Sequence, residues 1–178
     1  MNKNIKSRII LSLLLVLVIV LQTTIIPSMD IFGASLNLPM LFVVLISLFR
    51  GSASAYGWGL AIGLLLDLLA GKYIGLNMLS LLLCGFFSGM FFGKNYKTNF
   101  FIPVAATAAG GLIYSVIYLL LAKFAGAQIS FIHDLFVEMM PMLILTAAAS
   151  LPMYIIAYII HQRNSDNQFS GGTKGYNK

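Results

Sequence analysis

Residues 57–71 read Gly-Trp-Gly-Leu-Ala-Ile-Gly-Leu-Leu-Leu-Asp-Leu-Leu-Ala-Gly. Gly59 and Gly63 stand one helical turn apart, and Asp67 follows one turn later between apolar side chains. An ionisable residue within a segment this apolar costs about 2.5–3.5 kcal/mol on membrane-insertion scales. The sequence therefore predicts that Asp67 is kept for function or for the packing of the protein.

The composition around this stretch is that of an integral membrane protein. Of the 178 residues, 60% are hydrophobic and 9% are charged, whereas about 25% of the residues of a soluble domain are charged. We expect one all-α membrane bundle at 1–162, a disordered cytoplasmic tail at 163–178, and no separate catalytic domain. Cys84 is the single cysteine, so it cannot form an internal disulfide and is predicted to be a small packing residue.

The net charge of +6 does not indicate nucleic-acid binding, because the eleven Lys and Arg residues are scattered between apolar runs. Three of them, Lys3, Lys6 and Arg8, precede an apolar run from Ile9 to Ile26. A cleaved secretory signal is the alternative interpretation. The run is long and no Ala-x-Ala site follows it, which is typical of a retained transmembrane helix.

Polar or glycine-proline breaks divide the chain into six apolar segments. They are Ile9–Ile26, Leu38–Phe49, Ala53–Ala70, Ile74–Gly93, Phe101–Ala122 and Leu135–Ile160. A spanning helix needs about 20 residues, so the second segment is short and the sixth is long. The second is open to three interpretations: a half-helix, a re-entrant element, or a span lengthened by the Ser-Ala-Ser that follows Arg50.

Charge asymmetry favours six crossings over five. With six spans and both termini in the cytoplasm, nine basic residues lie inside and only Lys72 and Lys123 lie outside. Such a bias follows the positive-inside rule. A five-span arrangement without the second segment would place the Lys94–Lys97 turn and the basic C-terminus outside. We therefore expect a bundle of about six transmembrane helices with cytoplasmic ends.

One outer connection carries an amphipathic pattern before the last span. Ile129, Ile132 and Phe136 recur at helical spacing, whereas His133 and Glu138 share the opposite side. The pattern predicts either a short helix at the outer membrane interface or a polar-faced beginning of the sixth helix, and it does not choose between them.

Two segments carry small residues at every fourth position, which predicts close helix packing. These residues are Ala55, Gly59 and Gly63 in the third segment, and Gly85, Gly89 and Gly93 in the fourth. In lipid, close backbone approach supplies the van der Waals contact that holds helices together. The spacing alone does not decide whether these small residues contact the other helix or another protein. We favour packing within the chain.

For Asp67 the sequence leaves two roles open. In the first role, Asp67 lies near the outer end of its helix, some three residues before Gly71, and its carboxylate reaches lipid headgroups or caps a neighbouring helix. Alternatively, it is a buried anchor that fixes a loop or receives a partner. A proton relay would need a chain of ionisable groups through the membrane, and no other segment offers one. The sequence therefore does not predict a relay.

Catalytic and metal-binding patterns are poorly supported. A metal site needs three or four ligands that converge on one point. His133, Asp134 and Glu138 do not make such a set, and His161 is expected on the opposite side of the membrane. No span contains a histidine that could act as a base for a serine nucleophile. There is no phosphate-binding loop and no dinucleotide glycine pattern, so we expect no enzyme activity and no cofactor. Tyr114 and Tyr118 lie one turn apart and could line a cavity, although core packing is the favoured role.

The order of these features resembles the rod shape-determining protein MreD family. The resemblance is carried by Leu21-Gln22, then Pro27, Leu38-Pro39, the Gly63-Leu64-Leu65-Leu66-Asp67 core and Gly75 eight residues after Asp67. It covers Ile9 to about Ile160. The chain departs from the family at Met40, where members often carry an acidic residue.

The resemblance implies a non-enzymatic scaffold of the bacterial cell-elongation machinery in the cytoplasmic (inner) membrane. Its implied partners are an MreC-like single-span protein, an MreB-like actin homologue, a RodA-like glycosyltransferase with its transpeptidase, and membrane lipid. Nucleic acid is not among them. The residues expected to have structural or partner-binding roles are Pro39, Gly59, Gly63, Asp67, Gly71, Gly75, Gly85 and Gly89.

The resemblance also implies the six-helix fold of the substrate-binding subunits of vitamin transporters. A small-molecule-binding subunit of an energy-coupling transporter is therefore the alternative function. Such subunits typically present an Ala-x-x-x-Ala surface on the first span, but Ile9–Leu17 contains no alanine. This difference favours the scaffold.

Overall fold

The structure is a computed structural model that describes residues 17–24, 35–71, 73–92 and 101–169. These residues are helical apart from short turns, and no strand occurs among them. The helices are a segment at 17–24, α2 (Leu38–Arg50), α3 (Ser52–Ala70), α4 (Leu76–Phe92), α5 (Ile102–Phe124), α6 (Phe131–Asp134), the π-helix η2 (Leu135–Met139) and α7 (Met140–Phe169). The all-α architecture predicted from the sequence is confirmed for this part of the chain.

Three helical stretches are long and apolar enough to cross a membrane among the residues described. They are Ser52–Ala70, Ile102–Phe124 and Phe131–Tyr158, whereas α2 and α4 are shorter apolar helices. Most of the expected first span and the Lys94–Lys97 turn lie outside the described residues. α7 continues through 163–169, where the sequence analysis places the start of a tail, and 170–178 lie outside the description.

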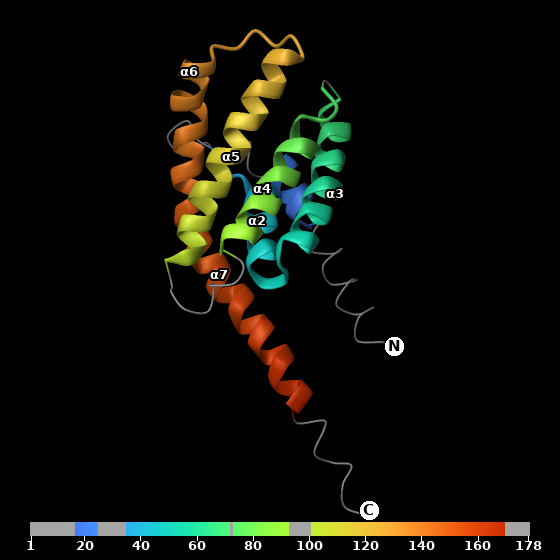
Figure 1. The fold of residues 1–178 in the computed structure, drawn as a ribbon, viewed down its shortest axis with the longest axis vertical. Helices are drawn as coiled ribbons and strands as arrows, with labels where there is room; N and C mark the ends of the chain where they lie inside the picture. Colours follow the sequence, from blue (N-terminus) through green and yellow to red (C-terminus); the bar gives the residue numbers. More distant parts are fainter. Residues whose placement is uncertain (1–16, 25–34, 72, 93–100, 170–178) are drawn as a thin grey trace, which may run out of the picture.

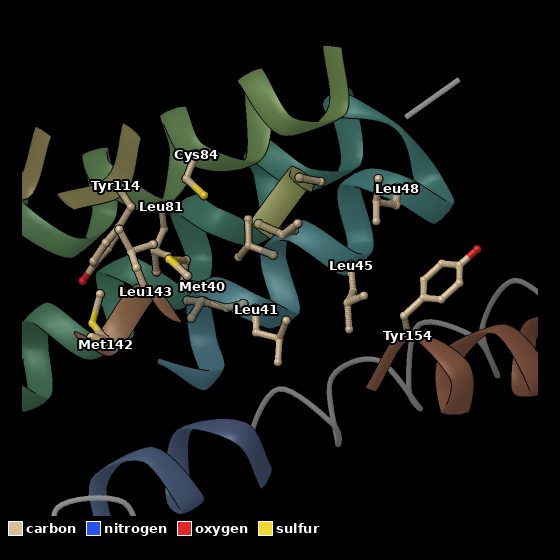
Figure 2. Packing of buried hydrophobic residues seen from close by; sticks show 14 of the residues in the cluster. Met40, Leu41, Leu45, Leu48, Leu81, Cys84, Tyr114, Met142, Leu143 and Tyr154 are labelled. Carbon is tan, nitrogen blue, oxygen red and sulfur yellow. The ribbon is translucent and has the colours of Figure 1, made fainter. Parts of the chain in front are cut away.

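The short helix α2 forms the centre of the bundle. It contacts α3, α4, α5 and α7, and its side chains from Pro39 to Leu48, Phe42 excepted, are buried. Met40 of α2, Leu81 of α4 and Leu143 of α7 belong to one cluster of buried core side chains (Figure 2). A helix of 13 residues is about 20 Å long, which is less than the hydrocarbon thickness. Four other helices, α3, α4, α5 and α7, pack against this short helix.

The helices run alternately up and down (Figure 1). The turn after α3 and the loop between α5 and α6 lie at one end of the bundle, which we call the loop end. Gly51, between α2 and α3, lies at the opposite end, and there α7 projects beyond the other helices. Gly51 adopts a positive φ of +81°, a conformation that glycine allows without strain.

The last span begins with an irregular turn. α6, η2 and α7 follow one another without interruption from Phe131, so the amphipathic segment is the beginning of the last helix and not a separate interfacial helix. The Met140 N–H donates to the Leu135 carbonyl, an i to i+5 bond. Proline at 141 cannot donate and crowds the preceding turn. A wider π-turn directly before Pro141 accommodates that crowding.

Candidate functional site

Asp67 is completely buried, and both of its carboxylate oxygens accept hydrogen bonds from the beginning of α4. Oδ2 accepts from the backbone N–H groups of Gly75 at 2.8 Å and Met78 at 3.1 Å. Oδ1 accepts from the backbone N–H and the side-chain Nδ2 of Asn77, both at 3.0 Å. The first N–H groups of a helix have no partner within the helix, so Asp67 supplies the missing acceptors.

The same arrangement compensates the negative charge of Asp67. A buried carboxylate is costly unless it is paired or hydrogen-bonded, and the N-terminus of a helix carries about half a positive elementary charge. Two glycines shape the turn that brings the carboxylate there. Gly71 caps α3 with φ +67° and donates to the Asp67 carbonyl, and Gly75 has φ +107°. A side chain at either position would be strained.

Asn77 extends this network to a third helix. Its Oδ1 accepts a 2.9 Å hydrogen bond from the Tyr114 hydroxyl of α5. Tyr114 is buried and its ring stacks on Tyr118, with centroids 5.8 Å apart. Since Tyr114 precedes Phe124 by ten residues, the network lies about 15 Å below the end of α5. Asp67 is thus buried inside the bundle, where it caps the neighbouring helix α4.

The N-terminus of α2 is capped by Asn37 and by side chains from two other helices. Asn37 is its N-cap, with Oδ1 accepting from Met40 N at 3.0 Å. Leu38 N donates to Gln22 Oε1 at 2.9 Å, and Asn37 N donates to Thr146 Oγ1 of α7 at 3.2 Å. Pro39 lies in the first turn of α2, where a backbone N–H would have no acceptor within the helix, so the proline leaves no helical hydrogen bond unmade. Thr146 follows Phe131 by fifteen residues, so α2 begins well inside the bundle rather than at its loop end.

A cavity of about 320 Å³ lies between the N-termini of α2 and α4. Gln22, Thr23, Asn37, Asn77 and Tyr114 form its polar wall, and the remaining wall comes from apolar residues of α2 and α3. Both capping networks therefore border one cavity. Known ligand pockets occupy about 300–1,000 Å³, which makes this cavity a candidate binding site.

The glycines of α3 and α4 face neighbouring backbone within the bundle. A Cβ atom at Gly59 would meet the Leu81 carbonyl, and one at Gly63 would meet the backbone of Met78. On α4, a Cβ at Gly85 would meet Val43 of α2 and Ala55 of α3, and one at Gly89 would meet Ser52 of α3. These glycines therefore lie in contacts between helices of this chain. Gly93 lies outside the described residues.

The polar residues near the last span do not join this site. His133 Nδ1 lies 3.2 Å from Asp134 Oδ1 in α6, and the His133 side chain is largely exposed. Within the ranges that the structure describes, no group of three His, Cys, Asp or Glu residues could hold a metal ion.

Sequence reasoning missed Asn37, Asn77 and Thr146 as parts of the site. A signal for two of them exists, because asparagine is a preferred N-cap residue and Asn37 directly precedes the Leu-Pro that opens α2. Asn77 follows Gly75 by two residues at the start of α4. No comparable signal marks Thr146, since its role depends on the packing of α7 against α2.

Comparison with protein families gives one match that covers most of the chain. The family model described as rod shape-determining protein MreD matches residues 2–163. That family consists of shape-determining membrane proteins and is not a known enzyme family. Comparison with curated proteins and with solved structures gives no match.

Proposed function

The chain belongs to the family of the rod shape-determining protein MreD, and we propose that it is a non-enzymatic scaffold of lateral peptidoglycan synthesis in the bacterial inner membrane. In this role it holds an MreC-like single-span protein and, through it or directly, the actin-like and peptidoglycan-synthesising partners. The family match over 2–163 is the observation that carries this proposal.

The proposed topology has six spans, cytoplasmic termini and the loop end facing outward. The basic residues support it: Arg50 ends α2 at the Gly51 end, and the C-terminal part of α7 continues past that same end. Lys123 lies at the loop end. Positive residues are enriched in cytoplasmic segments, so the Gly51 end is assigned to the cytoplasm.

Cysteine labelling tests this orientation. In a Cys84→Ala background, Ala53→Cys and Phe124→Cys each place one thiol at an exposed position, Phe124 being 85% exposed. A membrane-impermeant maleimide added to intact spheroplasts should label the cysteine at 124 and not the one at 53. The reverse pattern would contradict the topology.

The turn at Gly71–Gly75 is the part of the loop end that we assign to partner contact. Glycine stripes on α3 and α4 are occupied by contacts within the chain, so a partner must be met by other residues. Asp67 fixes this turn through α4, and Ile74 within it is 71% exposed. Because the hydrogen bond to Asp67 fixes Gly75, the exposed Ile74 beside it loses little conformational entropy when a partner binds.

Depletion in a rod-shaped bacterium tests the cellular role. Depleted cells should round up, and expression of the wild-type chain should restore rods. Cells that keep a normal rod shape after depletion would exclude the scaffold function.

Co-purification in mild detergent tests the partner role. The wild-type chain should retain an MreC-like protein, Asp67→Ala should retain less of it, and Gly57→Ala should serve as the matched control on α3. Because Asp67→Ala also affects stability, Ile74→Ser provides a second test that leaves the buried network intact. Equal recovery of the partner with Ile74→Ser would exclude the turn as its contact.

A further inference from the structure

The cavity between the N-termini of α2 and α4 has one polar and one apolar side. Its polar side consists of the amides of Gln22, Asn37 and Asn77 together with the hydroxyls of Thr23 and Tyr114. The apolar side includes Leu66, Leu69 and Ala70 at the end of α3. Leu69 is 63% exposed, so this side leads towards the surface of the bundle.

The polar side still has hydrogen-bonding capacity that contacts among the described residues do not use. Gln22 Oε1 accepts from Leu38 N, but within the described ranges no protein acceptor is recorded for Gln22 Nε2. Asn37 Nδ2 lies 3.7 Å from the Met142 sulfur, a weak acceptor, and the Asn37 side chain also lies within hydrogen-bonding reach of Tyr114. Gln22 Nε2 is therefore available as a donor to an occupant of the cavity.

The lining residues also indicate whether the cavity favours a charged or a neutral occupant. Among the residues that the structure describes, none that lines the cavity is Lys, Arg, His, Asp or Glu. The nearest described carboxylate, Asp67, is buried, and its two oxygens accept from four donors in Gly75 and the first residues of α4. The α2 N-terminus is capped by Asn37 and Gln22. An anion or a metal ion would therefore find no opposite charge on these lining residues, whereas a neutral group with hydroxyl or amide functions would find donors and acceptors among them.

We propose that this cavity binds a neutral, hydroxyl-rich group of about the size of a sugar ring. A volume of 320 Å³ corresponds to about ten water molecules at about 30 Å³ each. The amides and hydroxyls bind the hydroxyl groups, and the Leu66–Leu69 side covers the apolar face of the ring. The group is either the headgroup of a neutral glycolipid or a free sugar. This site goes beyond the scaffold role, because it requires no protein partner.

Native mass spectrometry of the chain released from lipid nanodiscs tests the site. The nanodiscs contain monoglucosyl diacylglycerol and phosphatidylglycerol in equal amounts, so the two lipids differ in headgroup charge and chemistry. We expect the glucosyl lipid to be retained in preference to phosphatidylglycerol. Competition with methyl β-glucoside distinguishes the sources: displacement indicates recognition of the free sugar, and retention of the lipid indicates recognition of the membrane-bound headgroup.

Two substitutions on α3 locate the binding. Ala70→Phe fills the cavity and should weaken retention at least about tenfold, equivalent to about 1.4 kcal/mol. Leu68→Phe adds the same ring two residues away, at a side chain that is 58% exposed and does not line the cavity, and should leave retention unchanged.

Thr23→Val removes one hydroxyl at constant volume and should weaken retention without blocking access. Equal retention of both lipids, or full retention by Ala70→Phe, would show a merely water-filled cavity and overturn the proposal.

Discussion

Asp67 Oδ1 accepts two hydrogen bonds from Asn77, one from its backbone N–H and one from its side-chain Nδ2, both at 3.0 Å. The two residues stand on either side of the turn between α3 and α4. Asn77 in turn accepts from Tyr114 of α5. One buried carboxylate thereby connects three helices through a single amide side chain.

Replacing Asp67 should destabilise the bundle more than replacing any exposed acid. Asp67→Asn puts an amide donor where two N–H groups of α4 require an acceptor, and leaving buried donors unsatisfied costs about 1–3 kcal/mol each. We expect a loss of about 2–4 kcal/mol in the free energy of unfolding, measured by denaturant titration in mixed micelles. Glu138→Gln, at an exposed position of η2, is the control and should change it little. Equal stability of the two variants would show that the cap is not structurally important.

Removing the Tyr114 hydroxyl should have a smaller effect. Tyr114→Phe keeps the stacked ring and removes the hydroxyl that donates to Asn77 and lies within reach of the Asn37 side chain, and a net hydrogen bond contributes about 0.5–1.5 kcal/mol. The control is its neighbour Ser115, whose buried hydroxyl has no hydrogen-bond partner in the described part of the chain. Ser115→Ala should therefore be neutral or slightly stabilising in the same titration. A larger loss for Ser115→Ala than for Tyr114→Phe would contradict this assignment.

The helix positions were predictable from the sequence because apolar runs and glycine-proline breaks are local features. The α3 run was expected at Ala53–Ala70 and the helix occupies Ser52–Ala70. The partner of Asp67 was not predictable from spacing, since it depends on the fold of the turn that returns α4 against α3. Asn37 has a local signature as an N-cap, but its contact with Thr146 joins residues 109 positions apart. Such a pairing is set by tertiary packing alone.

Two glycines of α3, Gly63 within the stripe and Gly57 outside it, should respond in opposite ways to substitution by alanine. Gly63→Ala introduces a Cβ into the backbone of Met78 and Asn77, and overpacking of this kind costs about 1–3 kcal/mol. Gly57 is exposed and has nothing within 4 Å of its Cβ position. Gly57→Ala should instead stabilise the helix by up to about 1 kcal/mol. Thermal unfolding in detergent compares the two, and a stabilising Gly63→Ala would disprove the close contact of α3 with α4.

The cap of α2 should depend on the side-chain oxygen at position 37. Asn37→Ala removes the acceptor for Met40 N, and loss of an N-cap costs about 0.5–2 kcal/mol. Asn37→Ser keeps a capping oxygen and should recover much of that loss, although it no longer reaches the Met142 sulfur. Hydrogen exchange of the Met40 amide, followed by NMR in micelles, reports on the cap directly. Faster exchange in Asn37→Ala than in Asn37→Ser is expected, because only the alanine leaves this buried N–H without its acceptor. Identical exchange in both variants would mean that packing alone holds the beginning of α2.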